Sequence, residues 1–287
     1  MSDAGATMRK IDTLQNKANA LQPPAPREAM PAPAKQEYRG KRVEGVFKIL
    51  GSNGFLSADT NDQRALAEQY RGVKRPILRN ADPRRDPPLP NGNLLMVASA
   101  LAGEGKTFAC IHLALSMIRE RDWSVVLIDC DCSKRHLTRV FGAENEPGVI
   151  DLLRDSTVAF DSLVMPTNLP GFSVLPVGAR DENAVELLAS RRMSELCNQV
   201  ASQVPDRIII FDSSPLLLAS EAAGLASHVG QIALVVRADS TPQTAVHAAL
   251  EKLDPDKAIG CVLNQSSHGA ASGYGYGYGY GYGSEGA

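Results

Sequence analysis

The fold is constrained most strongly by an alternation of short apolar segments with helix-length stretches, which runs from residue 93 to residue 264. Strands that are apolar on both faces and are joined by helices are typical of a mainly parallel sheet covered on each side. We therefore predict an α/β, doubly wound fold in which ligands bind at the carboxyl ends of the strands. The apolar segments read LLMVASA, SVVLID, FSVLPVG, RIIIFD, QIALVVRA and IGCVLN, and the predicted helices cover 105–120, 134–141, 183–203, 219–227 and 242–253.

The first strand, 94–99, runs into a loop that reads ALAGEGKT and then into a helix. This is a phosphate-binding loop, A-x-x-x-x-G-K-T, in which alanine replaces the usual first glycine. Lys106 would neutralise the β and γ oxygens of ATP, and the Thr107 hydroxyl would bind Mg²⁺. A glycine-containing turn with a surface lysine is the alternative, which the flanking strand and helix disfavour. The backbone N–H groups that would surround the phosphates belong to Gly103, Glu104, Gly105, Lys106 and Thr107.

Aspartates end two other strands, and the predicted topology places them at the same sheet edge as the loop. Asp129 and Asp131 follow the strand SVVLID, and Asp212 ends the strand RIIIFD. A lone aspartate at a strand end usually caps a helix or turn, but two such strands beside a phosphate loop favour handling of a metal and a nucleophile. We predict Asp212 as the better metal ligand. Asp129 and Asp131 would contact Mg²⁺ and orient or deprotonate the attacking hydroxyl, and the sequence leaves open which aspartate does which.

The C-terminal residues alternate tyrosine with glycine and contain five of the seven tyrosines of the chain. A segment so rich in glycine cannot bury enough apolar surface to offset its ordering entropy, so 267–287 is expected to stay mobile. Its phenol hydroxyls are candidate phosphoryl acceptors, and an adhesive tail without chemistry is the alternative. The candidate phosphorylation sites are Tyr274, Tyr276, Tyr278, Tyr280 and Tyr282.

The remaining boundaries follow from proline and charge. We expect residues 1–59 to be a disordered Pro/Ala-rich tether, and residues 60–90 to be an arm helix and linker. Asn61 or Asp62 would cap the arm helix and Pro76 would end it. The P-loop domain would then cover 91–266.

Composition excludes several classes of function. The net charge is -2, and the local basic strip at 64–85 is interpreted as a solvated helix face or linker, so no nucleic-acid partner is expected. The five cysteines are interpreted as reduced core residues, and a zinc site through sulfur is not expected. No stretch approaches the roughly 18–20 apolar residues of a membrane span, so we expect a soluble cytoplasmic protein.

Together these features resemble the bacterial tyrosine kinases (BY-kinases) that govern capsule and exopolysaccharide export, and particularly the exosortase-associated tyrosine autokinases. The resemblance covers about 60–264 and the tail, and it is carried by GEGKT, LIDCD, IIIFDSSP, the ELLAS segment at 186–190 and the tyrosine cluster. It implies a deviant Walker-type P-loop NTPase fold and an ATP- and Mg²⁺-dependent autokinase that phosphorylates its tail between the subunits of a ring. It also implies a membrane chain-length regulator and a protein tyrosine phosphatase as partners, with attachment to the inner membrane through a partner.

The resemblance also assigns individual residues. Glu68, Arg71 and Lys74 look like the family's E-x-x-R-x-x-R oligomerisation helix, with lysine in the final place. Phe108 is placed with the nucleotide-binding residues, and Asn264 would contact the adenine base, although a strand-ending turn residue is its simpler interpretation.

One segment departs from the family pattern. Where the family commonly has arginines followed by proline, this chain has Cys-Ser-Lys-Arg-His at 132–136. A basic contact to the phosphates or to a neighbouring subunit is therefore expected at Lys134 or Arg135.

Two other functions share these motifs. Partition and division-site ATPases have this fold but resemble KGGxGKT in the loop, with lysine where this chain has Leu101, and they give the tyrosine tail no role. The second alternative is a nucleotide-bound scaffold whose Gly-Tyr tail only self-associates.

Overall fold

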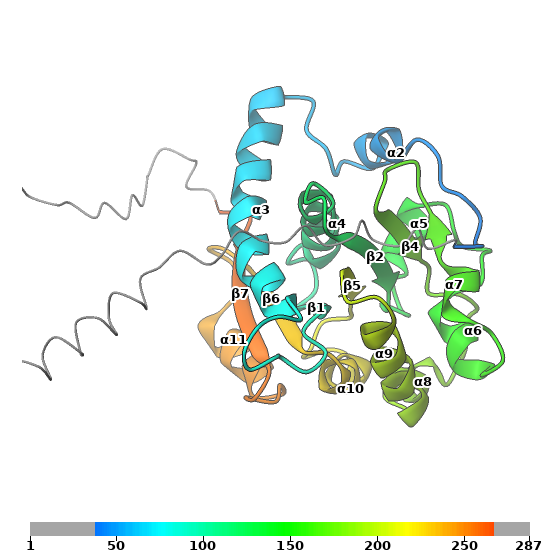
Figure 1. Cartoon of the computed structure of the whole chain (residues 1–287). Coiled ribbons are helices and arrows are strands. Elements are labelled where there is room, and N and C mark those ends of the chain that lie inside the picture. Colours follow the sequence, from blue (N-terminus) through cyan, green and yellow to red (C-terminus); the bar gives the residue numbers. More distant parts are fainter. Residues whose placement is uncertain (1–37, 267–287) are drawn as a thin grey trace, which may run out of the picture. The chain divides into compact units, whose positions relative to one another are not determined.

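The computed structural model describes residues 38–266, so the predicted tail and its tyrosines lie outside the described residues, as does most of the predicted N-terminal tether. The described chain forms a seven-stranded sheet with the order β3-β4-β2-β5-β1-β6-β7 (Figure 1). All neighbouring strands are parallel except the β3–β4 pair. The strands are β1 (Leu94–Ser99), β2 (Ser124–Asp129), β3 (Met165–Pro166), β4 (Phe172–Leu175), β5 (Arg207–Asp212), β6 (Gln231–Arg237) and β7 (Ala258–Asn264).

Helices cover both faces of this sheet, and the predicted doubly wound α/β fold is confirmed. Helices α2, α3, α4 and α5 pack on one face, whereas α6, α8, α9, α10 and α11 pack on the other (Figure 1). The helices are α2 (Val46–Ser52), α3 (Thr60–Ala81), α4 (Lys106–Met117), α5 (His136–Val140), α6 (Val149–Arg154), α7 (Phe160–Leu163), α8 (Ala184–Leu188), α9 (Arg191–Gln203), α10 (Ser220–His228) and α11 (Gln243–Leu250).

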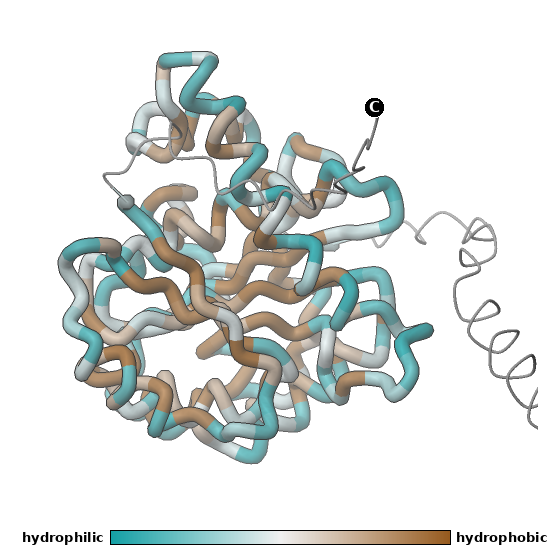
Figure 2. The backbone as a smooth tube through the Cα atoms, turned by 90° about the vertical axis from the view of Figure 1, so that its left-hand side faces the viewer, coloured by the Kyte–Doolittle hydropathy of each residue, from teal (hydrophilic) through white to brown (hydrophobic). Residues whose placement is uncertain are grey.

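The apolar strands explain the two-sided core. In β1, Leu94 and Met96 contribute to one buried cluster, and the intervening Leu95 and Val97 contribute to the other. Successive side chains of a strand point to opposite faces, so a strand that is apolar throughout supplies both clusters. Figure 2 shows hydrophobic residues concentrated in the central strands and hydrophilic residues in the outer turns.

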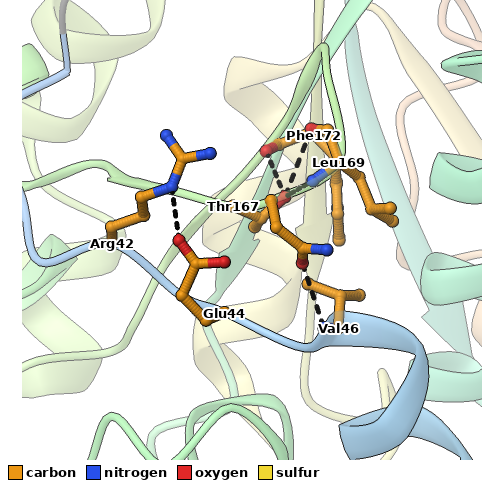
Figure 3. A network of polar contacts seen from close by, with 7 residues as sticks. Arg42, Glu44, Val46, Thr167, Leu169 and Phe172 are labelled. Atoms are coloured by element: carbon orange, nitrogen blue, oxygen red, sulfur yellow. Dashed lines mark hydrogen bonds and ion pairs between the residues drawn. The ribbon is translucent and has the colours of Figure 1, made fainter.

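The N-terminal part of the described chain corrects the predicted tether. Disorder through residue 59 is wrong for 38–59, because this segment contains α2 and buries Val46, Leu50 and Phe55. Val46 N–H donates to Asn168 Oδ1 at 3.1 Å (Figure 3). Asn168 N–H in turn donates to the Val43 carbonyl at 3.0 Å. A few apolar residues are enough to order this segment, because the folded sheet supplies the apolar surface that they cover.

Helix α3 differs from the predicted arm helix at both ends. Its N-cap is Asp59, whose Oδ1 accepts the Asn61 N–H at 2.7 Å, and the helix continues through Pro76 to Ala81. Proline removes one helical hydrogen bond, which usually ends or kinks a helix. Here the burial of Ile77 and Ala81 beyond the proline stabilises the last turn.

Three further details depart from expectation. The predicted helix at 183–203 is divided into α8 and α9, because Ser190 Oγ accepts the Met193 N–H at 3.3 Å and caps a new helix. Helices α6 and α7 and strand β3 were not predicted. All five cysteines are free, as expected, but Cys261 is exposed and Cys132 is half-buried, so these two are not core residues.

Within residues 38–266, no helix combines the length and the apolar character that crossing a bilayer requires.

Candidate active site

The phosphate loop joins β1 to α4 and takes a conformation that its glycines allow. Gly103 and Gly105 have φ of 83° and 95°, in the left-handed region that favours glycine. A side chain at Gly105 would also collide with the Asn264 amide. Ala100, which replaces the usual first glycine, is fully buried in the apolar core, so its methyl group is accommodated by packing.

Lys106 is the first residue of α4 and is largely buried. Its Nζ donates to Ser99 Oγ at 3.0 Å, which directs the ammonium back toward the end of β1. Burial lowers the pKa of Lys106, and the nearby carboxylates of Asp212 and Asp131 oppose this effect. The side chain is therefore a cation held among acids at the carboxyl edge of the sheet.

Thr107 and Asp212 connect the loop to β5. Thr107 Oγ1 donates to Asp212 Oδ2 at 2.7 Å, and Asp212 lies beside Asp129 in the parallel register of β5 and β2. Burial raises the pKa of Asp212, and the neighbouring Asp129 raises it further. The structure therefore brings Thr107, Asp129 and Asp212 together at one sheet edge.

Asp129 is directed toward the chain that follows it. Its Oδ1 accepts the Asp131 N–H at 3.1 Å, and its Oδ2 accepts Thr138 N–H at 2.8 Å and Thr138 Oγ1–H at 2.7 Å. Burial raises the pKa of Asp129, and the hydrogen bonds from Thr138 oppose that shift. Both oxygens thus fix the turn between β2 and α5.

Asp131 has different surroundings. Its Oδ1 accepts the Lys134 N–H at 2.9 Å and the Ser214 hydroxyl at 3.3 Å, and Ser214 also donates to Glu221 Oε1 at 2.9 Å. Within the described chain no hydrogen bond is found for Asp131 Oδ2. Of the two aspartates that the sequence left unassigned, Asp131 is the one with an oxygen available to a ligand.

Three side chains that were predicted to bind the nucleotide make contacts within the protein. Glu104 is buried, and its carboxylate accepts the Leu101 N–H at 2.6 Å and the Thr241 hydroxyl. Asn264 Nδ2 donates to the Glu104 carbonyl at 2.9 Å, which places the end of β7 against the loop. The ring centroid of Phe108 lies 4.2 Å from that of His112, so this side chain packs behind the loop. The contribution of Glu104, Phe108 and Asn264 to nucleotide binding stays a prediction.

The three predicted oligomerisation residues on α3 separate into two groups. Glu68 and Arg71 are exposed and form an ion pair with each other. Lys74 is buried, and its Nζ lies 2.7 Å from both the Ser116 carbonyl and Glu120 Oε1. Lys74 therefore joins α3 to α4 and presents no exposed ammonium to another chain.

The donors fit Mg²⁺ bound together with a nucleotide. Residues 38–266 contain no group of three or more His, Cys, Asp or Glu side chains that could hold a metal alone. Mg²⁺ usually takes one or two protein oxygens, with phosphate and water as its other ligands. The hard oxygens of Thr107 and Asp212 match that pattern.

The sequence missed several polar residues that support the site. Ser99, Thr138 and Glu221 are buried around it, and no local spacing singles them out. Ser214 lies within the quoted segment IIIFDSSP, so that motif contained the signal.

The chain is similar in fold to solved tyrosine kinase domains. No protein-family model matches the chain. The kinase domain of VpsO has a TM-score of 0.58 and 27% identity, and the match covers 72% of this chain and 98% of that domain. The kinase domain of Escherichia coli tyrosine kinase ETK has a TM-score of 0.56 and 29% identity, covering 66% and 73% respectively.

Curated relatives give the same result. The tyrosine-protein kinase wzc of Salmonella typhi is 32% identical over 184 residues, which is 63% of this chain and 25% of that protein. The tyrosine-protein kinase YwqD of Bacillus subtilis is 28% identical over 172 residues, which is 59% of this chain and 71% of that protein. The matched homologues are tyrosine-protein kinases, and the matched part of this chain is similar in sequence and fold to the kinase domains of bacterial tyrosine kinases.

Proposed function

We propose that this chain is an ATP-dependent protein tyrosine autokinase that phosphorylates its C-terminal cluster, Tyr274 to Tyr282, between subunits. The main support is the 2.7 Å hydrogen bond from Thr107 Oγ1 to Asp212 Oδ2, which joins the phosphate loop to β5 beside Asp131. The names of the relatives agree with this activity.

The loop and its neighbours would bind ATP. Backbone N–H groups from Gly103 to Thr107 lie at the start of α4, where a helix favours phosphate. Lys106 would leave Ser99 and neutralise charge on the phosphates. Mg²⁺, held by Thr107 and Asp212, would neutralise the charge that develops during transfer.

Asp131 would act on the acceptor. Its Oδ2 would take the proton of a tyrosine hydroxyl while the tyrosine oxygen forms a bond to the γ-phosphorus of ATP. The bond between the γ-phosphorus and the oxygen that bridges it to the β-phosphate would break, and ADP would leave. Asp129 would hold the turn that carries Asp131, through its bonds to Thr138 and to the Asp131 N–H.

Transfer between subunits is supported by chain length and by the exposed face of α3. Tyr274 lies ten positions after Asn264, and at about 3.3 Å per position this length of chain spans at most about 33 Å, enough to reach a neighbouring protomer. Contacts through Glu68 and Arg71 would assemble a ring. We further propose regulation of exopolysaccharide polymerisation and export at the inner membrane, through a membrane chain-length regulator and opposed by a protein tyrosine phosphatase.

The test is detection of phosphotyrosine after addition of Mg-ATP to the purified chain. We expect a signal from the intact chain and none from Lys106→Met or from a chain that ends at Ser272. Lys252→Met, a change at an exposed lysine outside the site, is the matched control and should retain the signal.

The same samples distinguish the ATPase alternative. Release of free phosphate by the intact chain, with Tyr274 to Tyr282 unmodified by mass spectrometry, would contradict the autokinase and favour a partition-type ATPase. Leu101, which stands where those ATPases have lysine, argues against that outcome.

A further inference from the structure

A polar cavity lies next to the candidate active site. It has a volume of about 740 Å³ and is formed by the turn after β2, helix α5 and the segment after β4, elements that are adjacent in Figure 1. Four of its lining residues are cationic, namely Lys134, Arg135, Arg139 and Arg180, and one, Glu144, is acidic. We call this cavity the basic pocket.

The cations of the basic pocket are not neutralised by the protein. Within residues 38–266 none of the four forms an ion pair. Other arginines behave differently, since Arg154 pairs with Asp181 at 3.2 Å and Arg191 pairs with Glu195 at 3.0 Å. Like charges that converge on one cavity repel one another, so an anionic ligand would relieve an unfavourable arrangement.

Hydrogen bonds to backbone carbonyls hold two of these four side chains, Arg135 and Arg139, in place. Arg135 has a φ of 50°, which a residue with a side chain rarely adopts, and it donates from Nη2 to the Gly178 carbonyl. Its Nε is buried and has no hydrogen-bond partner in the described chain. Arg139 Nη2 donates to the Lys134 carbonyl at 2.7 Å. The two guanidinium groups are therefore oriented before any ligand binds.

The basic pocket is directly adjacent to Asp131, the carboxylate proposed to deprotonate the acceptor tyrosine. Asp131 Oδ1 accepts the Lys134 N–H at 2.9 Å, and the Asp131 carbonyl accepts the Arg135 N–H at 2.8 Å. A single turn thus presents Asp131 to the phosphate loop and Lys134 and Arg135 to the pocket. A phosphoryl group transferred beside Asp131 would have a cationic cavity as its neighbour.

We propose that the basic pocket binds a phosphotyrosine of the C-terminal tyrosine segment, supplied by this chain or by a second copy. The proposal rests on the proposed function, because the autokinase reaction would make that phosphotyrosine. A phosphate monoester carries about -1.5 to -2 charges and three acceptor oxygens, which suit the forked donors of arginine. The cavity has room for a phenyl phosphate, and the glycines between the tyrosines let the backbone approach closely.

Binding of the product beside Asp131 would have a consequence for the reaction. A phosphorylated tail bound in the basic pocket would compete with a further tyrosine for the space beside Asp131, so it would slow the entry of that tyrosine. Each further phosphorylation would then be slower than the one before it.

The test measures binding directly, with the full chain purified without ATP and treated with phosphatase. The probe is a synthetic Gly-Tyr peptide of the tail sequence that carries one phosphotyrosine, followed by fluorescence anisotropy at a fixed ionic strength. We expect it to bind at least about tenfold more tightly than the unphosphorylated peptide, and the double variant Arg139→Gln/Arg180→Gln to lose at least about tenfold in affinity. Arg191→Gln, at an exposed arginine on α9, should change affinity by less than about twofold.

Several results would overturn the proposal. One is equal affinity for the phosphorylated and unphosphorylated peptides, and another is an equal loss in the Arg191→Gln control. Equal affinity for a phosphoserine peptide, or full competition by inorganic phosphate at the peptide's own concentration, would show that the pocket does not select phosphotyrosine. Because the peptide is synthetic, a chain without autokinase activity can still bind it, so failure of the proposed function and failure of the basic pocket are distinguishable.

Discussion

Asp129 and Asp131 are two positions apart, yet the surrounding residues divide their roles. Asp129 accepts hydrogen bonds at both oxygens, whereas Asp131 uses Oδ1 for the turn and for Ser214. A carboxylate that must orient or deprotonate a hydroxyl needs an oxygen within reach of it. The geometry therefore favours Asp131 over Asp129 for the acceptor tyrosine.

Replacement of Asp131 tests this division. Asp131→Asn keeps an oxygen for the Lys134 N–H and removes the base, so the rate of autophosphorylation should fall by about 10²–10⁴-fold. Binding of Mg-ADP should stay within about twofold, because Asp131 is not assigned to the nucleotide. Single-turnover phosphotyrosine formation and calorimetric ADP titration are the measurements. Retention of more than a tenth of the rate would count against Asp131 as the base.

His112 predicts a pH dependence of stability. Its Nε2 lies 2.9 Å from the Phe55 carbonyl, and burial lowers its pKa below the ordinary 6.5. Below about pH 6.5 the unfolded chain binds a proton that the folded chain does not, so the free energy of unfolding should decrease as the pH falls toward the folded pKa. His112→Gln can still donate to Phe55 and has no such proton, so part of this decrease should be absent. Urea denaturation between pH 7 and 5 measures it, and identical pH profiles would contradict the assignment.

At the scale of elements, α2 shows how a weak local signal becomes ordered structure. Val46 and Leu50 are one helical turn apart and both are fully buried, whereas Phe47 is 57% exposed. Residues four apart lie on the same helix face, so this short helix has one buried edge.

A matched pair of substitutions tests that edge. Leu50→Ala removes a fully buried side chain and should lower the free energy of unfolding by about 2–5 kcal/mol. Phe47→Ala, at the neighbouring exposed face, should change it by less than about 0.5 kcal/mol. Urea denaturation of the full chain measures both. Similar losses for the two variants would show that α2 is not held by its buried edge.

Helix α3 illustrates how tertiary contacts override a local stop signal. Tyr70, Lys74, Ile77 and Ala81 form its buried side, on both sides of Pro76. The ammonium of Lys74, bonded to the Ser116 carbonyl, fixes the helix to α4. The exposed Glu68 and Arg71 lie on the same helix and stay candidates for contacts between chains.

At the scale of the whole molecule, charge links the proposed reaction to assembly. The chain has a formal charge of -2, and five phosphates would add roughly -7.5 to -10. Repulsion of this size between neighbouring protomers opposes association, and it is screened by salt. Cycling between the two states would pace polymer export.

The expected outcome is dissociation of the phosphorylated form. Light scattering should show a lower mass after incubation with Mg-ATP, once phosphorylation has been verified. Incubation with Mg-ADP in place of Mg-ATP should leave the mass of the untreated sample unchanged, which controls for binding of nucleotide alone. An unchanged mass of the fully phosphorylated chain would contradict this prediction.

Much of the fold and of the site was predictable because the signals are local. Strands apolar on both faces, the GEGKT loop and aspartates at strand ends each lie within a few residues, and parallel topology brings them to one edge. Segment 38–59, the continuation of α3 beyond Pro76 and the burial of Lys74 were not predictable, since each depends on partners more than 40 residues away.

The sequence by itself determined the class of fold, the phosphate loop and the set of acids that surround it, because those properties reside in short motifs and in strand periodicity. Only the tertiary structure decided which aspartate keeps an oxygen for a ligand and which cations converge in the basic pocket. Both outcomes depend on hydrogen bonds and burial between segments distant in the chain, such as Asp131 with Ser214 and Arg135 with Gly178.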